Sequence, residues 1–448
     1  MFKKLREEYG KCIYHGYTLT HTEDTLQVEY QIEIENLDTF STRWYFPKSM
    51  IPFFKEDDPM ARRLLYLLGM SEVISYYKLT CAPIVVVKES LNDFEKQWWN
   101  KLFYHGLGEF LYRNEISITQ EELVSFEVQG EAYTPIISKE VMEGALIPIG
   151  GGKDSAVTID LLKDTAMTKM VYMINTRGAC DATADIGNYP QERRITPRRT
   201  LDKKILEYNK QGFLNGHIPF SAVVAFSAVF CAYCNHLQYV ILSNEASANE
   251  SSVKDSTVNH QYSKSLEFEN DFREYMQSIL CPVDYFSLLR PLSEYQIGKH
   301  FAKLQAFHPV FKSCNLGSKT DSWCCNCSKC LYVYVLLSAF LSKEELINIF
   351  GEDLLVREDL VETFYELIGL RDTKPFECVG AVDEINFAVI EAIKRYTELP
   401  LMYQLYTQTP LYQEYMSKEN PYNTYYEKEN NVPDRFATIV KKEMIEHV

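Results

Sequence analysis

The spacing of apolar and polar residues changes near residue 140. Between Thr25 and Ile34 the two kinds alternate, which predicts a strand with one face exposed. Met60 to Leu68 and Leu91 to Leu102 have helical spacing, and Pro83 to Val87 is a short apolar run typical of a buried strand. Residues 1–140 are therefore expected to form an N-terminal α+β domain.

Beyond residue 140 short apolar runs alternate with helical segments. The predicted strands are Leu146–Ile149, Lys169–Asn175 and Tyr239–Glu245. The predicted helices between and around them are Ala156–Lys163, Thr200–Asn209 and Pro219–Asn235. This order predicts right-handed crossovers and a parallel sheet, so residues 141–312 are expected to form an α/β domain. Ligands of such sheets bind at the carboxyl ends of the strands.

Residues 313–448 are expected to be a helical C-terminal region with a cysteine cluster at its start. Helical spacing extends over 331–341, 343–350, 360–370 and 382–397. The tyrosine-rich stretch 401–426 contains Pro410 and Pro421 and is expected to pack across another domain as an irregular arm.

Charge and composition narrow the class of partner. The 448 residues include 46 basic and 62 acidic residues, a formal net charge of −16, which is a poor match for nucleic acid. The charged start Met1–Glu7 has no apolar run after it, and no apolar stretch reaches the roughly 18 residues of a membrane span. Twelve cysteines in this context favour reduced thiols or metal binding. A cytoplasmic protein with a small-molecule substrate, and no membrane partner, is expected.

The stretch that follows the first α/β strand carries the clearest chemistry. Gly150, Gly151 and Gly152 precede Lys153-Asp154-Ser155 and a helical segment, an order that predicts strand, tight turn and helix. Glycines permit close approach of an anion, and the start of a helix offers unpaired N–H groups. Lys153 would add a mobile charge for phosphate oxygens. A glycine-rich turn without a ligand is the alternative, but three glycines before Lys-Asp-Ser exceed what a turn requires.

This stretch lacks the spacing of a Walker A loop and of a dinucleotide fingerprint. It resembles the Ser-Gly-Gly-x-Asp-Ser signature of the PP-loop ATP pyrophosphatases, with Gly150 in place of the serine. The resemblance implies a parallel-sheet, adenine nucleotide alpha hydrolase-like core. It also implies ATP cleaved between the α and β phosphates, with Mg²⁺ balancing the triphosphate charge.

Four cysteines near residue 320 have the spacing of a metal site. Cys314, Cys324, Cys327 and Cys330 form a C-x9-C-x2-C-x2-C pattern whose thiolates can surround one tetrahedral zinc ion, and Cys325 is then a spare. We favour a structural zinc ion. The alternative, a group of buried reduced thiols without metal, has nearly equal weight.

Several stretches between about residues 75 and 385 together resemble a narrower family. They are Gly106–Asn114, Gly150–Ser155, Ser243–Glu250, Val258–Glu269, Trp323–Cys330 and Lys374–Gly380. They are similar to the MurL family of ATP-dependent UDP-N-acetylmuramoyl-L-alanyl-L-glutamate epimerases of bacterial cell-wall synthesis. The resemblance implies that ATP converts the terminal glutamate carboxyl to an acyl adenylate. The α-proton, made more acidic, is removed and replaced on the other face, and AMP and pyrophosphate are released.

The resemblance and the sheet topology together give a set of expected site residues. Those expected to bind ATP are Gly150, Gly151, Gly152, Lys153, Asp154, Ser155, Asn175, Ser243 and Asn244. Lys153 would neutralise the leaving pyrophosphate, and Asp154 would bind Mg²⁺ or orient the loop. Those expected to contact the carboxylates or diphosphate of the UDP-muramyl dipeptide are Asn259, His260 and Lys264. His260, Lys264 and Cys378 are candidates for the α-proton base, and His260 is counted with Lys153 and Asp154 as catalytic.

Two other functions are compatible with these residues. One is a PP-loop enzyme that adenylates a base, a tRNA or another carboxylate, because the cysteine cluster also resembles that of the 7-cyano-7-deazaguanine synthases. The acidic net charge argues against a tRNA substrate. The other is a nucleotide sensor that binds ATP without cleaving it. Measuring AMP against ADP distinguishes these functions.

Overall fold

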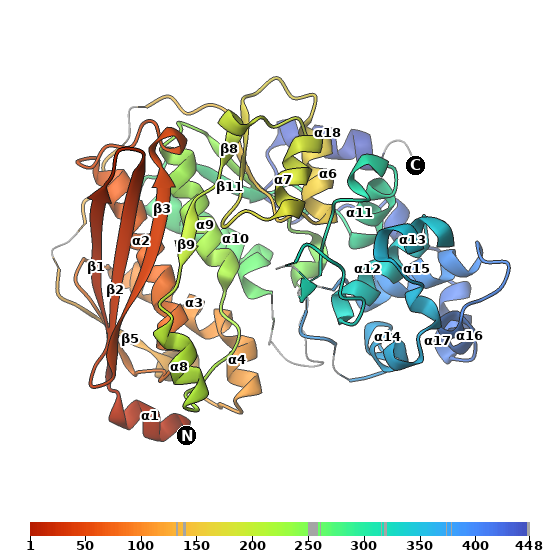
Figure 1. The fold of residues 1–448 in the computed structure, drawn as a ribbon, viewed down its shortest axis with the longest axis horizontal. Coiled ribbons are helices and arrows are strands. Elements are labelled where there is room, and N and C mark those ends of the chain that lie inside the picture. Colours follow the sequence, from red (N-terminus) through yellow and green to blue (C-terminus); the bar gives the residue numbers. More distant parts are fainter. Residues whose placement is uncertain are drawn as a thin grey trace.

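The fold is built from two sheets and a helical C-terminal region (Figure 1). The computed structural model describes residues 1–130, 133–137, 140–249, 259, 261–314, 316–317, 320–372, 374–377 and 379–445. The first sheet lies at one end of the molecule, the second lies near its middle, and most of the C-terminal helices lie at the other end. Within these residues no helix combines the length and the apolar character that crossing a bilayer requires.

The first sheet is mixed and has six strands in the order β5-β4-β1-β2-β3-β9. Its strands are β1 (Lys11–His21), β2 (Thr25–Ile34), β3 (Asp38–Pro47), β4 (Ile84–Val87), β5 (Ser125–Val128) and β9 (Arg198–Thr200). The predicted alternation in β2 is confirmed, because its apolar side chains are buried at every second position. They pack with α2 (Pro59–Tyr77), a helix longer than predicted and buried along nearly its whole length.

The second sheet has five parallel strands in the order β11-β10-β6-β7-β8. They are β6 (Ala145–Pro148), β7 (Lys169–Tyr172), β8 (Arg194–Ile195), β10 (Tyr239–Leu242) and β11 (Asp284–Ser287). The helices connecting them include α6 (Lys153–Leu162), α7 (Gly178–Ile186), α8 (Lys204–Lys210), α9 (Phe220–Tyr233) and α10 (Leu266–Ser278). The predicted α/β class with a parallel sheet is confirmed. The direction of strand succession reverses between β6 and β10, which makes the end of β6 the expected ligand site.

The first two predicted regions share one hydrophobic core. The helix α9 packs on α2, and the ring of Phe226 stacks on Trp99 with centroids 5.3 Å apart. Trp98 and Trp99 belong to α3 (Asp93–Gly106), which is followed by α4 (Gly108–Arg113) and α5 (Gln120–Leu123). The strand β9, although it follows residue 140, pairs with β3 of the first sheet. Packing is therefore continuous across residue 140, and the division into 1–140, 141–312 and 313–448 stays a prediction.

The C-terminal region is helical, as predicted. Its helices are α12 (Ser328–Ser338), α13 (Lys343–Phe350), α14 (Val361–Leu367), α15 (Val382–Ile393), α16 (Leu401–Thr407), α17 (Pro410–Met416) and α18 (Asp434–Met444), and they are preceded by α11 (Glu294–Phe301) at the end of the predicted α/β domain. The prediction of an irregular arm over 401–426 is wrong in part. Pro410 begins α17 rather than interrupting it, because proline lacks only an N–H that the first helical turn leaves unpaired. The chain then returns to the second sheet, where α18 packs on α6 (Figure 1).

Candidate functional site

The glycine-rich stretch forms the predicted strand, turn and helix. The strand β6 ends at Pro148, and α6 begins at Lys153. Gly151 has φ = +74°, and a Cβ atom there would lie 2.9 Å from Ala179, so only glycine fits. The N–H of Gly150 donates to Oγ of Ser155 at 3.1 Å and closes the turn. We call residues 150–155 the phosphate loop.

The ends of β7 and β10 carry three of the predicted ATP-binding residues. Oγ of Thr158 on α6 donates to Oγ of Ser243 at 2.8 Å, and Nδ2 of Asn244 donates to Oγ of Ser287 at 3.0 Å. The side chain of Asn175 is bound to the backbone N–H and carbonyl of Arg199. Ser243 therefore lies against the helix of the phosphate loop, whereas Asn175 joins the end of β7 to β9. Their roles in binding adenosine stay predictions.

Lys153 differs from the sequence prediction of a mobile cation. Its side chain is fully buried, and Nζ forms ion pairs with Asp154, at 2.5 Å, and with Glu294. Burial favours a neutral amine, but these two carboxylates outweigh it and raise the pKa of Lys153 above its usual value. Lys153 is therefore a buried, charged tether between the phosphate loop and α11 rather than a mobile cation, and its role at phosphate oxygens stays a prediction.

Glu294 is a site residue that the sequence analysis missed. Burial raises its pKa to about 7, an effect that Lys153 opposes and that the carboxylates of Asp154 and Glu245 reinforce. It is the first residue of α11, whose start is fixed by a capping box between Ser293 and Gln296. Its partner Lys153 lies 141 positions away in the sequence. The sequence around Glu294 indicates only a capped helix start just beyond β11. It does not indicate that Glu294 pairs with Lys153.

Asp154 is the carboxylate of the phosphate loop itself, and its pKa is lowered. Burial would raise the pKa of Asp154, but the nearby charges of Lys153, Lys329 and Lys264 outweigh burial and lower it. The carboxylate therefore remains ionised at neutral pH. Lys264, a predicted substrate residue, and Lys329, which was not predicted, both contribute positive charge at the phosphate loop.

Arg290 holds together the segment that follows β10 and the start of α10. It is fully buried and donates to the carbonyls of Glu245, at 2.7 Å, and Lys264, at 2.5 Å, and to the carboxylate of Glu269, at 3.1 Å. Asn259 lies in the same segment, and its Nδ2 donates to the carbonyl of Ala248 at 3.0 Å. The predicted residues His260 and Cys378 lie outside the described residues.

A segment from the C-terminal region lies directly on the phosphate loop. The N–H of Lys312 donates to the carbonyl of Gly151 at 2.8 Å, and a Cβ atom on Gly152 would meet Oγ of Ser313 at 2.9 Å. The carboxylate of Asp321 accepts hydrogen bonds from the N–H groups of Gly178 and Ala179, at 3.0 and 3.1 Å. These two N–H groups start α7, which packs on Gly151.

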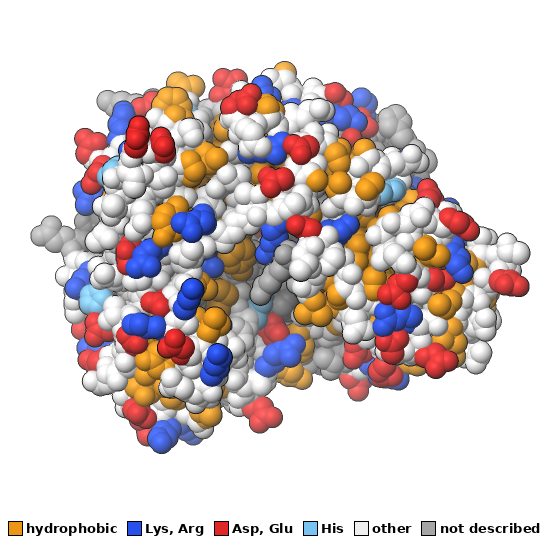
Figure 2. All heavy atoms as spheres, viewed as in Figure 1, with side chains coloured by type: hydrophobic (Ala, Val, Ile, Leu, Met, Phe, Trp, Pro, Cys, Tyr) orange, Lys and Arg blue, Asp and Glu red, His pale blue; other side chains and the backbone are white. Residues whose placement is uncertain are grey.

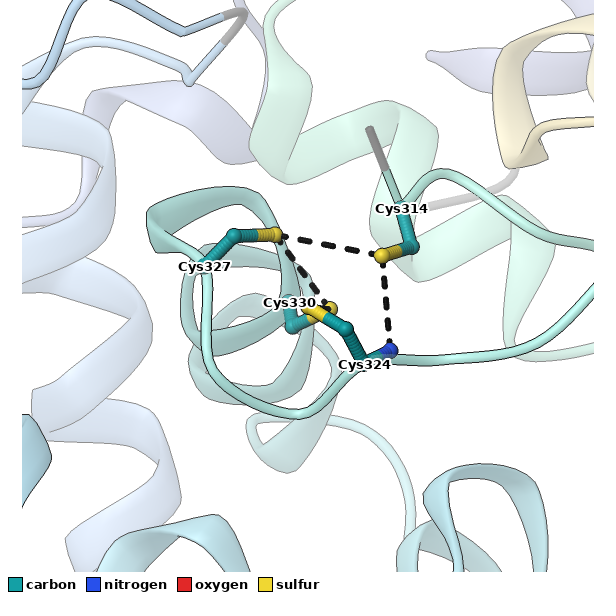
Figure 3. A group of neighbouring side chains, drawn as sticks. All are labelled: Cys314, Cys324, Cys327 and Cys330. Atoms are coloured by element: carbon teal, nitrogen blue, oxygen red, sulfur yellow. Dashed lines mark hydrogen bonds between the residues drawn. The ribbon is translucent and has the colours of Figure 1, made fainter. Parts of the chain in front are cut away.

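The four predicted cysteines converge (Figure 3). Their sulfur atoms all lie within 4.8 Å of one another. The sulfurs of Cys314 and Cys327 are 4.0 Å apart, those of Cys324 and Cys330 are 3.8 Å apart, and those of Cys327 and Cys330 are 3.5 Å apart. Sulfurs around a tetrahedral zinc ion would be about 3.8 Å apart, so the geometry fits this metal. Cys325 points elsewhere and donates to the carbonyl of Phe350.

Backbone N–H groups also point at the sulfur atoms, as expected where thiolates hold a cation. The N–H of Gly317 donates to Sγ of Cys314 at 3.0 Å, and the N–H groups of Cys324 and Asn326 donate at 3.4 Å to Cys314 and Cys324. The cluster begins two residues after Lys312. It therefore shares one short segment with the wall of the phosphate loop.

Together the fold and the site define an α/β protein with a glycine-rich loop at the end of a parallel sheet, beside four cysteines that could hold a metal ion. Comparison with known families sharpens this class. The MurL N-terminal domain matches residues 3–288 and the MurL C-terminal domain matches residues 310–419. The chain belongs to the MurL family.

Individual relatives agree with this assignment. The chain is 35% identical over 338 residues to the UDP-N-acetyl-alpha-D-muramoyl-L-alanyl-L-glutamate epimerase of Xanthomonas oryzae pv. oryzae, which covers 73% of this chain and 74% of the relative. It is 32% identical to the proteins of the same name from Micromonospora sp. and Salinispora tropica, over 72% of this chain and 73% and 71% of those relatives. No solved structure matches the chain.

Proposed function

We propose that this chain is an epimerase that converts the terminal L-glutamate of UDP-N-acetylmuramoyl-L-alanyl-L-glutamate to D-glutamate during the synthesis of peptidoglycan precursors. One observation carries the proposal. Two MurL domain models together match most of the chain, and three relatives named as this epimerase align over more than two thirds of their lengths. Membership in the family supports the epimerisation. The geometry at the end of the parallel sheet supports the use of ATP to activate the substrate.

The driving reaction is adenylation by ATP. The α-carboxylate of the glutamate attacks the α-phosphorus, the bond to the β-phosphate breaks, and pyrophosphate leaves. The acyl adenylate has lost the carboxylate charge, so its α-proton is more acidic. A base removes this proton, a proton returns on the opposite face, and water cleaves the adenylate to give AMP and the D-glutamyl product. The phosphate loop supports this step for two reasons. Gly151 adopts a positive φ that glycine takes without strain, and the unpaired N–H groups at the start of α6 are suited to binding phosphate oxygens.

The described residues divide the work of holding ATP. Gly150, Gly151, Gly152 and Ser155 hold phosphate oxygens through the loop and the helix start. Asp154 is the ionised carboxylate for Mg²⁺, which supplies charge neutralisation when it is bound. Lys153 pairs with Asp154 and with Glu294, and it therefore orients Asp154 rather than contacting phosphate. The positive charges of Lys264 and Lys329 act on Asp154 and are suited to stabilising the leaving pyrophosphate.

Cys314, Cys324, Cys327 and Cys330 hold a structural zinc ion in this proposal. The sulfur distances and the N–H donors to sulfur support a thiophilic metal. The ion would fix the segment whose Lys312 N–H binds Gly151. Zinc would therefore support nucleotide binding through the backbone and without contact to ATP.

Isotope exchange tests the function. Enzyme in D₂O, supplied with ATP, Mg²⁺ and the L-glutamate dipeptide nucleotide, should form D-glutamate with deuterium at Cα, together with one AMP and one pyrophosphate for each substrate adenylated. Pyrophosphate release without deuterium exchange would replace the epimerase with a ligase or an amidating enzyme. ATP binding without any AMP would replace it with a nucleotide sensor.

A further inference from the structure

A second feature of the molecule is a cavity of about 940 Å³ between α4 and the start of α10. Tyr104 and Tyr112 line one side of it, and Asn249, Asn259 and Glu267 line the other. A volume of this size is typical of sites for drug-sized ligands. Figure 2 shows a recess on the face of the molecule between the first sheet and the C-terminal helices.

The walls of this cavity carry the wrong charge for a phosphate or a carboxylate. Glu267 and Glu429 line it, and its described lining residues include neither lysine nor arginine. Lys101 is held behind Glu267, with Nζ 2.7 Å from that carboxylate and 2.6 Å from Asp271. Burial lowers the pKa of His105, another lining residue, which leaves the imidazole uncharged at neutral pH. Lys101 offsets part of this charge, but an anionic group placed against the two carboxylates would still be repelled, so the part of the ligand that enters the cavity should be uncharged.

The remaining wall groups suit a ring that carries hydroxyl or amide groups. The ring of His105 stacks on Tyr262 with centroids 5.1 Å apart, which fixes a flat wall. The amide oxygen of Asn249 accepts from the N–H of Leu266 at 2.7 Å, and Asn259 is fixed by its bond to Ala248. Carboxylates accept hydrogen bonds from hydroxyl groups, and aromatic faces cover the apolar sides of rings. The polar groups are thus oriented before a ligand arrives.

The segment that follows β10 contributes both to the cavity wall and to the surroundings of the phosphate loop. Ala248, which binds Asn259 of the cavity wall, lies three residues after Glu245, whose carboxylate acts on Lys153. Arg290 binds the carbonyls of both Glu245 and Lys264. The two places are therefore held by one hydrogen-bonded segment, which suits a ligand with a neutral end and an anionic end.

We propose that this cavity is a subsite for a neutral, hydroxyl-bearing ring of the nucleotide-sugar substrate, with the diphosphate attached to that ring outside the cavity and the anionic glutamate end at the phosphate loop. The inference rests on the proposed function and adds a subsite to it. The ring is either the uridine nucleoside or the amino sugar, which share this chemistry. It also changes the predicted role of Asn259 from binding carboxylates or diphosphate to orienting a neutral group.

Equilibrium binding of two partial ligands tests the subsite. The ligands are UDP, which has the nucleoside without the sugar, and N-acetylmuramoyl-L-alanyl-L-glutamate, which has the sugar without the nucleoside. The variants are Glu267→Gln, in which Lys101 keeps Asp271, and Tyr112→Ala, at a side chain that is 47% exposed. The matched control is Glu398→Gln, because Glu398 lines a separate cavity of about 780 Å³ beside α13 and α16.

Both variants should weaken the Kd of one partial ligand about tenfold, the loss expected for one hydrogen bond or ring contact. Weaker binding of UDP would identify the nucleoside as the occupant, and weaker binding of the muramoyl dipeptide would identify the sugar. The Kd of ATP should stay that of the wild type, and the control should bind both ligands normally. Thermal unfolding checks the fold of each variant, and Tyr112→Ala carries the test if Glu267→Gln does not fold.

Two results would overturn the inference. If wild-type protein epimerises in D₂O while both folded variants bind both partial ligands within about twofold of the wild type, the subsite is excluded and the proposed function stands. If wild-type protein binds neither partial ligand nor the complete dipeptide nucleotide, the subsite and the proposed function both fail.

Discussion

The phosphate loop and the cysteine cluster lie side by side but are held in different ways. In the loop, the chain supplies every partner that fixes the geometry: Gly150 binds Ser155, Gly151 binds Lys312, and Lys153 binds Asp154 and Glu294. In the cluster, four sulfur atoms face one another, and their described partners are weak S–H contacts and backbone N–H groups. The loop is thus preorganised by the chain, whereas the cluster has a geometry that a cation would stabilise.

This difference teaches where a ligand contributes to the fold. A buried ion pair is expensive to desolvate and holds only while both partners remain, so the loop depends on its side chains. A thiolate site gains most of its stability from the metal, so the cluster depends on an ion. The two meet in residues 312–321, and a change in either should be felt at the other.

The largest effect is expected at the phosphate loop from Asp154→Asn. This change keeps the side-chain volume and removes the charge that Mg²⁺ would bind, so pyrophosphate release should fall about 1,000-fold. Pyrophosphate assays with ATP and the dipeptide nucleotide measure the loss, and circular dichroism checks the fold. Release at the wild-type rate by a folded variant would remove the loop from the reaction.

The next largest effect separates the cysteine cluster from a group of ordinary thiols. Cys327→Ser should release zinc and lower the free energy of unfolding by about 4 kcal/mol, a Tm decrease of about 4 °C, because a metal ligand is lost. Cys325→Ser is the matched control, since Cys325 lies next to the cluster but donates to Phe350. Zinc content is measured on protein purified without added metal, and calorimetry gives the Tm.

Less than half an equivalent of zinc in folded wild-type protein would contradict the structural zinc ion. Equal Tm changes in the two cysteine variants would do the same. In contrast, if ATP affinity decreases when zinc is removed, the cluster supports the loop through residues 312–321.

Sequence reasoning was strongest where the signal was local. The strand β6, the turn and α6 follow from consecutive residues. The convergence of the four cysteines follows from their short spacing along the chain. The parallel order of β6, β7 and β10 followed from alternating strands and helices. The short strand β8 and the edge strand β9 were missed, because two or three residues carry too little periodicity to predict a strand.

The ion-pair partners of buried charged side chains were not foreseen from the sequence. A lysine after three glycines suggested a phosphate ligand, yet Lys153 pairs with Glu294, and nothing local announces a partner from another helix. The same holds for Lys329, which is brought to Asp154 by the cluster and α12. Long-range electrostatic partners are set by packing, and packing is not readable from the spacing of residues along one segment.

A smaller effect is expected in the pH dependence of the free energy of unfolding. It reports whether Glu294, the partner of Lys153, is charged or protonated. The pKa of Glu294 is about 7 in the folded protein against 4.5 as its ordinary value, so the folded state keeps a proton that the unfolded state loses. Its contribution to stability is therefore greatest at low pH and declines as pH rises from about 4.5 to about 7, by on the order of 1–3 kcal/mol. Lys153, Asp154, Glu245 and Lys329 are the charges that act on it.

Urea unfolding of the wild type and of Glu294→Gln at pH 5, 6, 7 and 8 measures this term as the difference between the two proteins. The wild type should lose stability relative to the variant as pH rises to about 7 and change little beyond. A difference that is constant or that rises with pH would contradict the raised pKa.

The smallest effect should come from Asp321→Ala, at the junction of the two sites. The carboxylate of Asp321 binds the first N–H groups of α7, so its loss should lower the free energy of unfolding by about 1 kcal/mol, as for a helix cap. Because α7 packs on Gly151, the Kd of ATP should rise about threefold, while zinc content stays that of the wild type. Asp372→Asn, at an exposed bend, is the control. A loss of zinc in Asp321→Ala would mean that the segment supports the cluster more than the loop, which would reverse the direction of coupling argued above.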